Sequence, residues 1–284
     1  MILVPVDGST TAEAALPLAV AIGKKMGAEV RLALVREASS FDAQAYMDNT
    51  AEWVRERLTG GYAAVSAVIL EGDATSALCV EAEAADFVVM STHGHGGFER
   101  MWLGSVTDRL LRRASASVIV VKPGWERAVS YESIEKIVVP LDGSDLAERA
   151  AASAVALAGL FGASVTLFRV VSPAGIASVS LHDTPSTAAR LLKALKNEAR
   201  RYLESVRKGL TDLSCTIDVA VGVERSPASG ILHFVRERRA DMIVMTAQTR
   251  HHLSRVFLGS VTDKVVRGSP VPVLVVRGGV SSPE

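Results

Sequence analysis

Short apolar runs alternate with amphipathic stretches along the chain. Runs such as "FVVM" (87–90) and "VIVV" (118–121) are apolar without interruption, which is typical of strands buried on both faces of a parallel sheet. In the first half the pattern predicts strands at 2–6, 29–35, 63–70, 86–90 and 117–121, and helices near 9–26, 42–59, 73–84 and 104–114. Strands that alternate with helices in this way predict an open, doubly wound α/β fold.

The chain contains an internal repeat. "ILVPVDGS" at 2–9 returns as "IVVPLDGS" at 137–144, and "WLGSVTDRLLRRASASVIVVK" at 102–122 returns as "FLGSVTDKVVRGSPVPVLVVR" at 257–277. A tandem duplication explains both matches. We therefore expect two α/β domains, each an open five-stranded parallel sheet with about four helices, at 1–122 and 136–284, joined by a linker at 123–135. The second copy repeats the strand pattern at 136–141, 164–171, 215–221, 241–246 and 272–276.

The second copy carries about twenty additional residues, mainly at 172–192 ("SPAGIASVSLHDTPSTAARLL"). Its Ser, Pro, Ala and Gly content predicts a loop that leads into a longer helix. A lid over a ligand is the alternative for this segment.

Composition narrows the function classes. Apolar residues make up 49% of the chain, enough for two buried cores, and the 31 basic residues equal the 31 acidic ones. A neutral chain has no general attraction to nucleic acid or anionic lipid. The two cysteines lie far apart and form neither a disulfide framework nor a metal set. With neither a basic leader nor an apolar run of spanning length, we expect a soluble, cytoplasmic protein.

Candidate chemistry lies at the carboxyl ends of the first and fourth strands. In open α/β sheets ligands bind outside these ends, where the strand order reverses. "PVDGS" follows the first strand and "STHGHGG" the fourth. Asp7 is a candidate to accept from a ribose hydroxyl or to hold a cation through water; the alternative is that Asp7-Gly8-Ser9 forms only a turn and a helix cap.

The stretch "STHGHGGFERMWLGSVTD" (91–108) invites three interpretations: a phosphate cradle, a metal site or a structural turn. Gly94, Gly96 and Gly97 leave the backbone bare for close approach, and Ser105 and Asp108 have the spacing of a capping box at a helix start. Such a start favours phosphate, and the hydroxyls of Ser105 and Thr107 are further candidate donors. His93 and His95 lack the additional ligands of a metal site, so we expect no metal bound by the protein alone.

These paired motifs resemble the universal stress protein family in its tandem two-domain form, over nearly the whole chain. Members share the pattern Gly, two residues, Gly, nine residues, then Gly-Ser or Gly-Thr, which lines an ATP site in the nucleotide-binding members. Here the frame is Ser91, Gly94 and Gly104-Ser105, with a departure at Ser91. The resemblance implies ATP, with Mg²⁺, in the first copy. The implied site residues are Pro5, Val6, Asp7, Val35, Met90, Ser91, Gly94, His95, Gly104, Ser105, Val106 and Thr107.

The second copy departs further from that pattern. Its frame is Thr246, Thr249 and Gly259-Ser260, so a β-branched residue replaces the second glycine. Such a residue resists positive φ and brings a methyl group toward the ligand. We therefore expect nucleotide mainly in the first copy. The corresponding residues of the second copy are Pro140, Leu141, Asp142, Val170, Met245, Gly259, Ser260, Val261 and Thr262.

The resemblance also implies a regulatory, stress-adaptation role and an intramolecular pseudo-dimer, in which strand 118–121 pairs with strand 273–276. Association of two chains into a homodimer is a further option. Two rival functions stay open: a protein-interaction module that binds no nucleotide, and a weak ATPase or nucleotide-transferring enzyme. The loop after strand one lacks the paired glycines of related ATP-cleaving enzymes, and we identify no nucleophile–base pair. We therefore expect no efficient catalysis.

Overall fold

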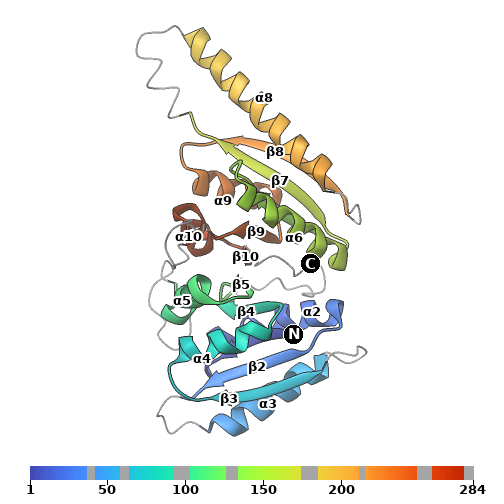
Figure 1. Ribbon diagram of the computed structural model, residues 1–284, viewed down its shortest axis with the longest axis vertical. Helices are drawn as coiled ribbons and strands as arrows, with labels where there is room; N and C mark the ends of the chain where they lie inside the picture. The colour runs from blue at the N-terminus through green and yellow to red at the C-terminus, as the bar shows by residue number, and fades with distance from the viewer. Residues whose placement is uncertain are drawn as a thin grey trace. The chain divides into compact units, whose positions relative to one another are not determined.

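A computed structural model describes residues 1–36, 42–57, 64–92, 103–125, 134–173, 185–210, 215–247 and 258–277 of the chain (Figure 1). Its contacts divide the chain into two compact units. The first comprises 1–133, 247–259 and 269–284, and the second comprises 134–246 and 260–268.

The first unit is a doubly wound α/β structure whose sheet has the order β3-β2-β1-β4-β5. All neighbouring pairs among these five strands are parallel. Every residue of β1 is buried, as expected for a central strand covered on both faces. The strands are β1 (Ile2–Val6), β2 (Val30–Val35), β3 (Val65–Leu70), β4 (Phe87–Ser91) and β5 (Ser117–Val121). The helices are α1 (Thr10–Glu13), α2 (Leu16–Met26), α3 (Ala43–Arg57), α4 (Ala74–Glu81) with the 3₁₀ turn η1 (Ala82–Ala84), and α5 (Ser105–Arg113).

The second unit repeats this order as β8-β7-β6-β9, again with parallel pairs. Its strands are β6 (Lys136–Pro140), β7 (Ser164–Val171), β8 (Ile217–Val223) and β9 (Met242–Thr246). Its helices are α6 (Asp145–Phe161), α8 (Pro185–Gly209), α9 (Pro227–Arg238) and α10 (Ser260–Gly268). The predicted α/β fold is confirmed, with every predicted strand present and its ends within two residues of the prediction.

The last strand of the second copy, β10 (Val273–Val276), groups with the first unit because it pairs antiparallel with β5. The register places Val273 opposite Val120 and Val275 opposite Val118. The predicted pairing of the two terminal strands is thereby confirmed.

Two local predictions need correction. The helix predicted at 9–26 is two helices, α1 and α2, with Pro17 in the first turn of α2. Proline has no N–H to continue a helix and its ring clashes with the preceding turn. The equivalent position in the second copy is Ala152, and α6 there is continuous.

The loop expected at 172–192 ends earlier than predicted. Residues from Pro185 onward belong to α8, which has 25 residues against the 15 of α3, so the predicted longer helix is confirmed. Pro185 suits the first turn of a helix, and the Ala, Arg and Leu residues that follow are strong helix formers, while Ala199 and Leu203 are buried on one face further along α8. Residues 174–184 lie outside the described part of the chain. None of the helices within the described part has both the length and the apolar composition needed to cross a membrane.

Candidate functional site

The carboxyl ends of β1 and β4 lie side by side because these two strands are parallel neighbours, with Ile2 opposite Phe87 and Leu3 opposite Val88. The strand order reverses between them. The loops that begin at Asp7 and at Thr92 therefore leave the same edge of the sheet on the two sides of the switch point, where ligands bind in folds of this type. In the second unit β6 and β9 have the same relation.

The Asp-Gly-Ser loop after β1 forms a turn held by side-chain hydrogen bonds. Asp7 Oδ1 accepts hydrogen bonds from the Ser9 backbone N–H (3.0 Å) and from Ser9 Oγ (2.6 Å), and Ser9 in turn caps α1 by accepting from the Ala12 N–H. Gly8 has φ +81°, a conformation that favours glycine. The turn-and-cap interpretation is confirmed. Since Asp7 is also exposed at the switch point, this role leaves the ligand interpretation open.

The second copy builds the same turn. Asp142 Oδ1 accepts from the Ser144 N–H at 3.0 Å and from Ser144 Oγ at 2.7 Å, and Gly143 has φ +96°. The repeated Pro-x-Asp-Gly-Ser sequence therefore has a structural reason in each copy, independent of any ligand.

The start of α5 is bound to the end of β4. The Gly104 N–H donates to the carbonyl oxygen of Thr92 (2.7 Å), and Thr107 Oγ1 donates to the carbonyl oxygen of Ser91 (2.9 Å). Thr107 is only 3% exposed. The prediction that its hydroxyl is a phosphate donor is wrong, because this hydroxyl is buried and already donates to the strand. Its backbone N–H stays a candidate.

The second copy has the same connection, since Thr262 Oγ1 donates to the carbonyl oxygen of Thr246 (3.1 Å). This hydrogen bond, which we call the threonine joint, explains why "LGSVTD" is identical in the two copies, because the threonine of the segment attaches the following helix to the end of the fourth strand. Its presence alone is therefore weak evidence for a ligand.

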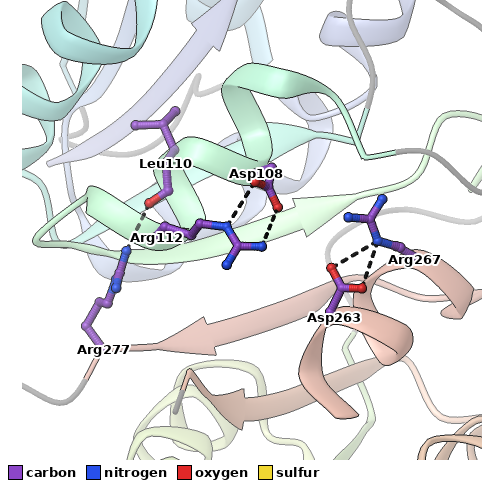
Figure 2. Close-up of polar contacts among 6 residues, drawn as sticks. All are labelled: Asp108, Leu110, Arg112, Asp263, Arg267 and Arg277. Atoms are coloured by element: carbon purple, nitrogen blue, oxygen red, sulfur yellow. Dashed lines mark hydrogen bonds and ion pairs between the residues drawn. The ribbon is translucent and has the colours of Figure 1, made fainter. Parts of the chain in front are cut away.

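The predicted capping box at Ser105 and Asp108 is also wrong. The N-cap of α5 is Gly104, which has no side chain to cap with, and Ser105 is the first helical residue. Asp108 instead forms an ion pair with Arg112 one turn later, in which Nε and Nη2 each donate to one carboxylate oxygen, at 2.9 and 3.0 Å. Asp263 pairs with Arg267 at the equivalent positions of α10, where Nε alone donates to both oxygens (Figure 2).

The first turn of α5 offers polar hydrogens to a ligand. The N–H groups of Ser105, Val106 and Thr107 have no carbonyl four residues earlier in the helix, and they carry the partial positive charge of the helix start. Ser105 is exposed and Gly104 and Val106 are half-buried. The second copy places Ser260, Gly259 and Val261 equivalently, with the same exposure.

The apolar residues expected around an adenine end the strands at the same edge. Val6 and Met90 are each 5% exposed, while Leu141 and Met245 are 3% and 6% exposed. These four side chains belong to the cores of their units. Pro5 is likewise buried, whereas its counterpart Pro140 is half-buried, as are Val35 and its counterpart Val170.

Several predicted residues lie outside the described part of the chain. These are Gly94 and His95 of the first copy, and Thr249 of the second, together with His93, Gly96 and Gly97. The difference between the copies at the second glycine of the frame therefore stays a sequence prediction. Among the described residues, no three His, Cys, Asp or Glu side chains gather as metal ligands would.

Arg277 contacts α5, the helix that begins at the candidate site, and the sequence analysis did not predict this contact. It follows β10, and its Nη2 donates to the carbonyl oxygen of Leu110 in α5 at 3.0 Å (Figure 2). Its backbone N–H donates to Ser117 Oγ. Burial lowers the pKa of its guanidinium. A cation near the carboxyl end of a helix stabilises it, so Arg277 supports, from the opposite end, the helix whose start faces the switch point. A contact across 167 positions leaves no local sequence signal.

The geometry defines a class: two doubly wound α/β units, each with a capped turn and an open helix start at its switch point. Comparison with known proteins then gives the family, since a profile described as the universal stress protein family matches residues 1–122 and again 133–277. The chain belongs to the universal stress protein family, as the sequence resemblance predicted.

Individual relatives agree with this assignment. A universal stress protein of Methanocaldococcus jannaschii is 33% identical over 143 residues, which are 50% of this chain and 82% of that protein. One from Mycolicibacterium smegmatis is 28% identical over 202 residues, which are 69% of this chain and 63% of that protein. The crystal structure of a universal stress protein from Archaeoglobus fulgidus superposes with a TM-score of 0.67 at 21% identity, covering 98% of each chain, and supports the fold.

Proposed function

We propose that this protein binds ATP, with Mg²⁺, chiefly in its first copy, and that it acts as a regulatory stress-adaptation module rather than as a catalyst. The observation that carries the proposal is the placement of two polar loops. One follows β1 and the other connects β4 to the open start of α5, and both leave the sheet edge where the strand order reverses. This is the usual place for a nucleotide in an open α/β sheet.

The residues fit the two ends of the ligand. The first-turn N–H groups of α5 and the exposed Ser105 hydroxyl suit a phosphate, as helix starts do in nucleotide-binding folds. The exposed Asp7 carboxylate suits a ribose hydroxyl or a hydrated Mg²⁺, which commonly keeps several of its waters. Gly104 brings no side chain into the space before the helix.

The preference for the first copy rests on the sequence. Both copies build the turn after the first strand and the joint before the last helix. Only the first has the frame glycine at position 94 together with the run Gly96-Gly97, where the second has Thr249 and no other glycine before Gly259.

A direct test begins with nucleotide released from the purified protein. Denatured protein should yield ATP or ADP by mass spectrometry, in an amount nearer one than two per chain. The same preparation, stripped and supplied with excess MgATP, should release phosphate or AMP far more slowly than one per second, roughly the lower end of ordinary enzymes. Turnover at or above that rate would favour the enzyme. Failure of the stripped protein to bind millimolar MgATP would favour the interaction module.

A further inference from the structure

The chain is neutral as a whole, but its charges are distributed unevenly. Helix α8 contains seven of the 31 basic residues of the chain and two of its 31 acidic residues. The equivalent helix of the first copy, α3, has two basic and three acidic residues. The expectation that the chain does not attract nucleic acid came from its total charge, and that reasoning does not apply to this one helix.

The basic residues of α8 lie together on its exposed side. The opposite side is apolar and packs against β7 and β8 (Figure 1), where Ala199 and Leu203 are buried. At about 100° per residue, the seven cations occupy an arc of about 140° around the helix axis and extend over about 27 Å of its length. All seven are exposed. They are Arg190, Lys193, Lys196, Arg200, Arg201, Arg207 and Lys208.

Most of these cations have no acidic partner within the described part of the chain. The carboxylate of Glu204 is already paired with Arg207, at 2.7 Å. Five cations form no ion pair with any described residue, namely Lys193, Lys196, Arg200, Arg201 and Lys208. Lys196 follows Lys193 by three residues and precedes Arg200 by four, and like charges at these spacings destabilise a helix. A bound polyanion would relieve this repulsion.

The same face also carries neutral hydrogen-bonding groups. An open hollow on it is lined by Asn197, Ser205, Arg200, Arg201, Lys208 and the paired Glu204. An arginine presents five N–H donors in a planar fork that matches phosphate oxygens. Amide and hydroxyl side chains contact phosphates as well, and such contacts position a protein on a nucleic acid. The face therefore has the chemistry of a phosphate-backbone surface.

The shape of the face distinguishes between polyanions. A flat lipid surface meets a cylinder along a line, whereas the cations of α8 extend around a wide arc. A helix that binds lipid also inserts its apolar side, and the apolar side of α8 packs on the sheet. The major groove of B-form DNA is about 12 Å wide and receives an α-helix between two rows of phosphates. The major groove of duplex RNA is too narrow to do so.

We propose that α8 is a docking surface for double-stranded DNA, which it binds through the phosphate backbone. The helix lies along the major groove, and its cations contact phosphates of both strands. The surface shares no residue with the candidate nucleotide site of either copy, so the proposal does not depend on ATP binding.

The test is a titration of a fluorescein-labelled DNA duplex of mixed sequence with the full chain, followed by fluorescence anisotropy. With a duplex of about 24 base pairs in about 50 mM NaCl, the dissociation constant should be near or below ~10 µM. The logarithm of the association constant should decrease with the logarithm of salt concentration, with a slope between about −3 and −5. This slope follows because each contacted phosphate contributes about −0.9 and five unpaired cations are available.

A pair of double variants locates the surface. Arg200→Gln combined with Arg201→Gln should weaken DNA binding at least about tenfold and make the salt slope shallower by about 2. The matched control is Arg55→Gln combined with Arg57→Gln, which removes two exposed cations from the equivalent helix α3. This control should change the dissociation constant by less than about twofold, because α3 carries no basic face.

A second double variant of α8 guards against a local folding effect. Lys193→Gln combined with Lys196→Gln lies about two turns earlier in the helix and should cause a similar loss of DNA affinity. All the substituted side chains are exposed and glutamine is a good helix former, so the thermal melting temperatures should stay close to that of the wild type.

Four results would overturn the proposal. The first is no saturable binding of the DNA duplex up to ~100 µM protein in low salt. The second is tighter binding of duplex RNA of the same sequence. The third is tighter binding to phosphatidylcholine vesicles that contain about 30% phosphatidylserine, which would make α8 a lipid-binding surface. The fourth is a loss of DNA affinity in the α3 control as large as that in the α8 variants.

Discussion

Single side chains join the fourth strand of each copy to the helix that follows. Thr107 in the first copy and Thr262 in the second are buried, and each hydroxyl donates to the carbonyl oxygen of the residue that ends the strand. A neighbouring serine, Ser105, has a hydroxyl of the same kind but is exposed at the helix start. Within one short motif, Thr107 thus has a structural role, whereas Ser105 is the residue proposed to contact the ligand.

Thr107→Val should therefore destabilise the protein without removing a ligand contact. The substitution keeps the shape and leaves the Ser91 carbonyl oxygen without this donor, at a cost of about 1–3 kcal/mol in the free energy of unfolding. Ser105→Ala is the matched control and should change that free energy by less than about 0.5 kcal/mol, while weakening MgATP binding. Urea denaturation measures the first effect and calorimetry the second. The reverse pattern of effects would contradict these roles.

Two half-buried tyrosines, Tyr46 and Tyr202, predict a pH dependence of stability at alkaline pH. Burial is the largest cause that raises the pKa of Tyr46 and of Tyr202 above the ordinary value of 10.0. The unfolded chain then loses these protons before the folded one does. Stability from these two groups is fully present below pH 10 and decreases as the pH rises above it.

Absorbance at 295 nm, which reports tyrosinate, measures this directly. Folded protein should show a tyrosine fraction that ionises well above pH 10, and Tyr46→Phe should reduce that fraction. If all tyrosines of the folded protein titrate near pH 10, the raised pKa of these two hydroxyls is contradicted.

Some residues of the site could be predicted from local sequence and others could not. The turn at Asp7-Gly8-Ser9 was predictable because aspartate, glycine and serine each have a local role in it. The capping box was predicted wrongly for two reasons. The helix begins after Gly104, so Ser105 is already its first residue. Asp108 has Arg112 four residues later and pairs with it instead. Arg277 was missed because its partner, the carbonyl oxygen of Leu110, lies 167 positions earlier in the chain.

At the scale of elements, α5 is supported at both ends. Its start is held to β4 through Gly104 and Thr107, and its carboxyl-terminal turn accepts a hydrogen bond from Arg277 after β10 (Figure 2). The helix that offers its first turn to a ligand thus depends on a side chain from the far end of the chain.

Arg277→Met should loosen α5 in particular. It keeps much of the side-chain length but removes a partly buried, charge-assisted hydrogen bond, with an expected loss of about 1.5–3 kcal/mol in the free energy of unfolding. Amide hydrogen exchange should accelerate in 105–113 more than in β1. The control is Arg112→Met, which removes a half-exposed ion pair and should cost less than about 1 kcal/mol. Equal protection of α5 in Arg277→Met and wild type would contradict this support.

Element boundaries show where sequence reasoning works. The strands were predicted closely because buried parallel strands are continuous apolar runs bounded by turn residues. The break between α1 and α2 was missed although Pro17 marks it, since proline is also compatible with a first helical turn. In the second copy, Ala152 permits one continuous helix.

At the scale of the whole chain, duplication has kept the framework and varied the functional surfaces. Both copies retain the strand order, the Asp-Gly-Ser turn, the threonine joint and the aspartate–arginine pair of the last helix. They differ at the frame glycine that Thr249 replaces and at the run Gly96-Gly97, which the second copy lacks. Similar folds with different side chains at their ligand-facing edges are expected to bind different ligands.

The central claim is that nucleotide binds at the start of α5 in the first copy. Its most direct test is a calorimetric titration of stripped protein with MgATP, in wild type and in two matched variants, Gly104→Glu and Gly259→Glu. We predict close to one site per chain in wild type. Gly104→Glu should reduce the affinity at least tenfold, because a bulky anion fills the space before the helix and repels phosphate, whereas Gly259→Glu should change it little. No binding by wild type at millimolar MgATP, or equal losses in the two variants, would contradict the account.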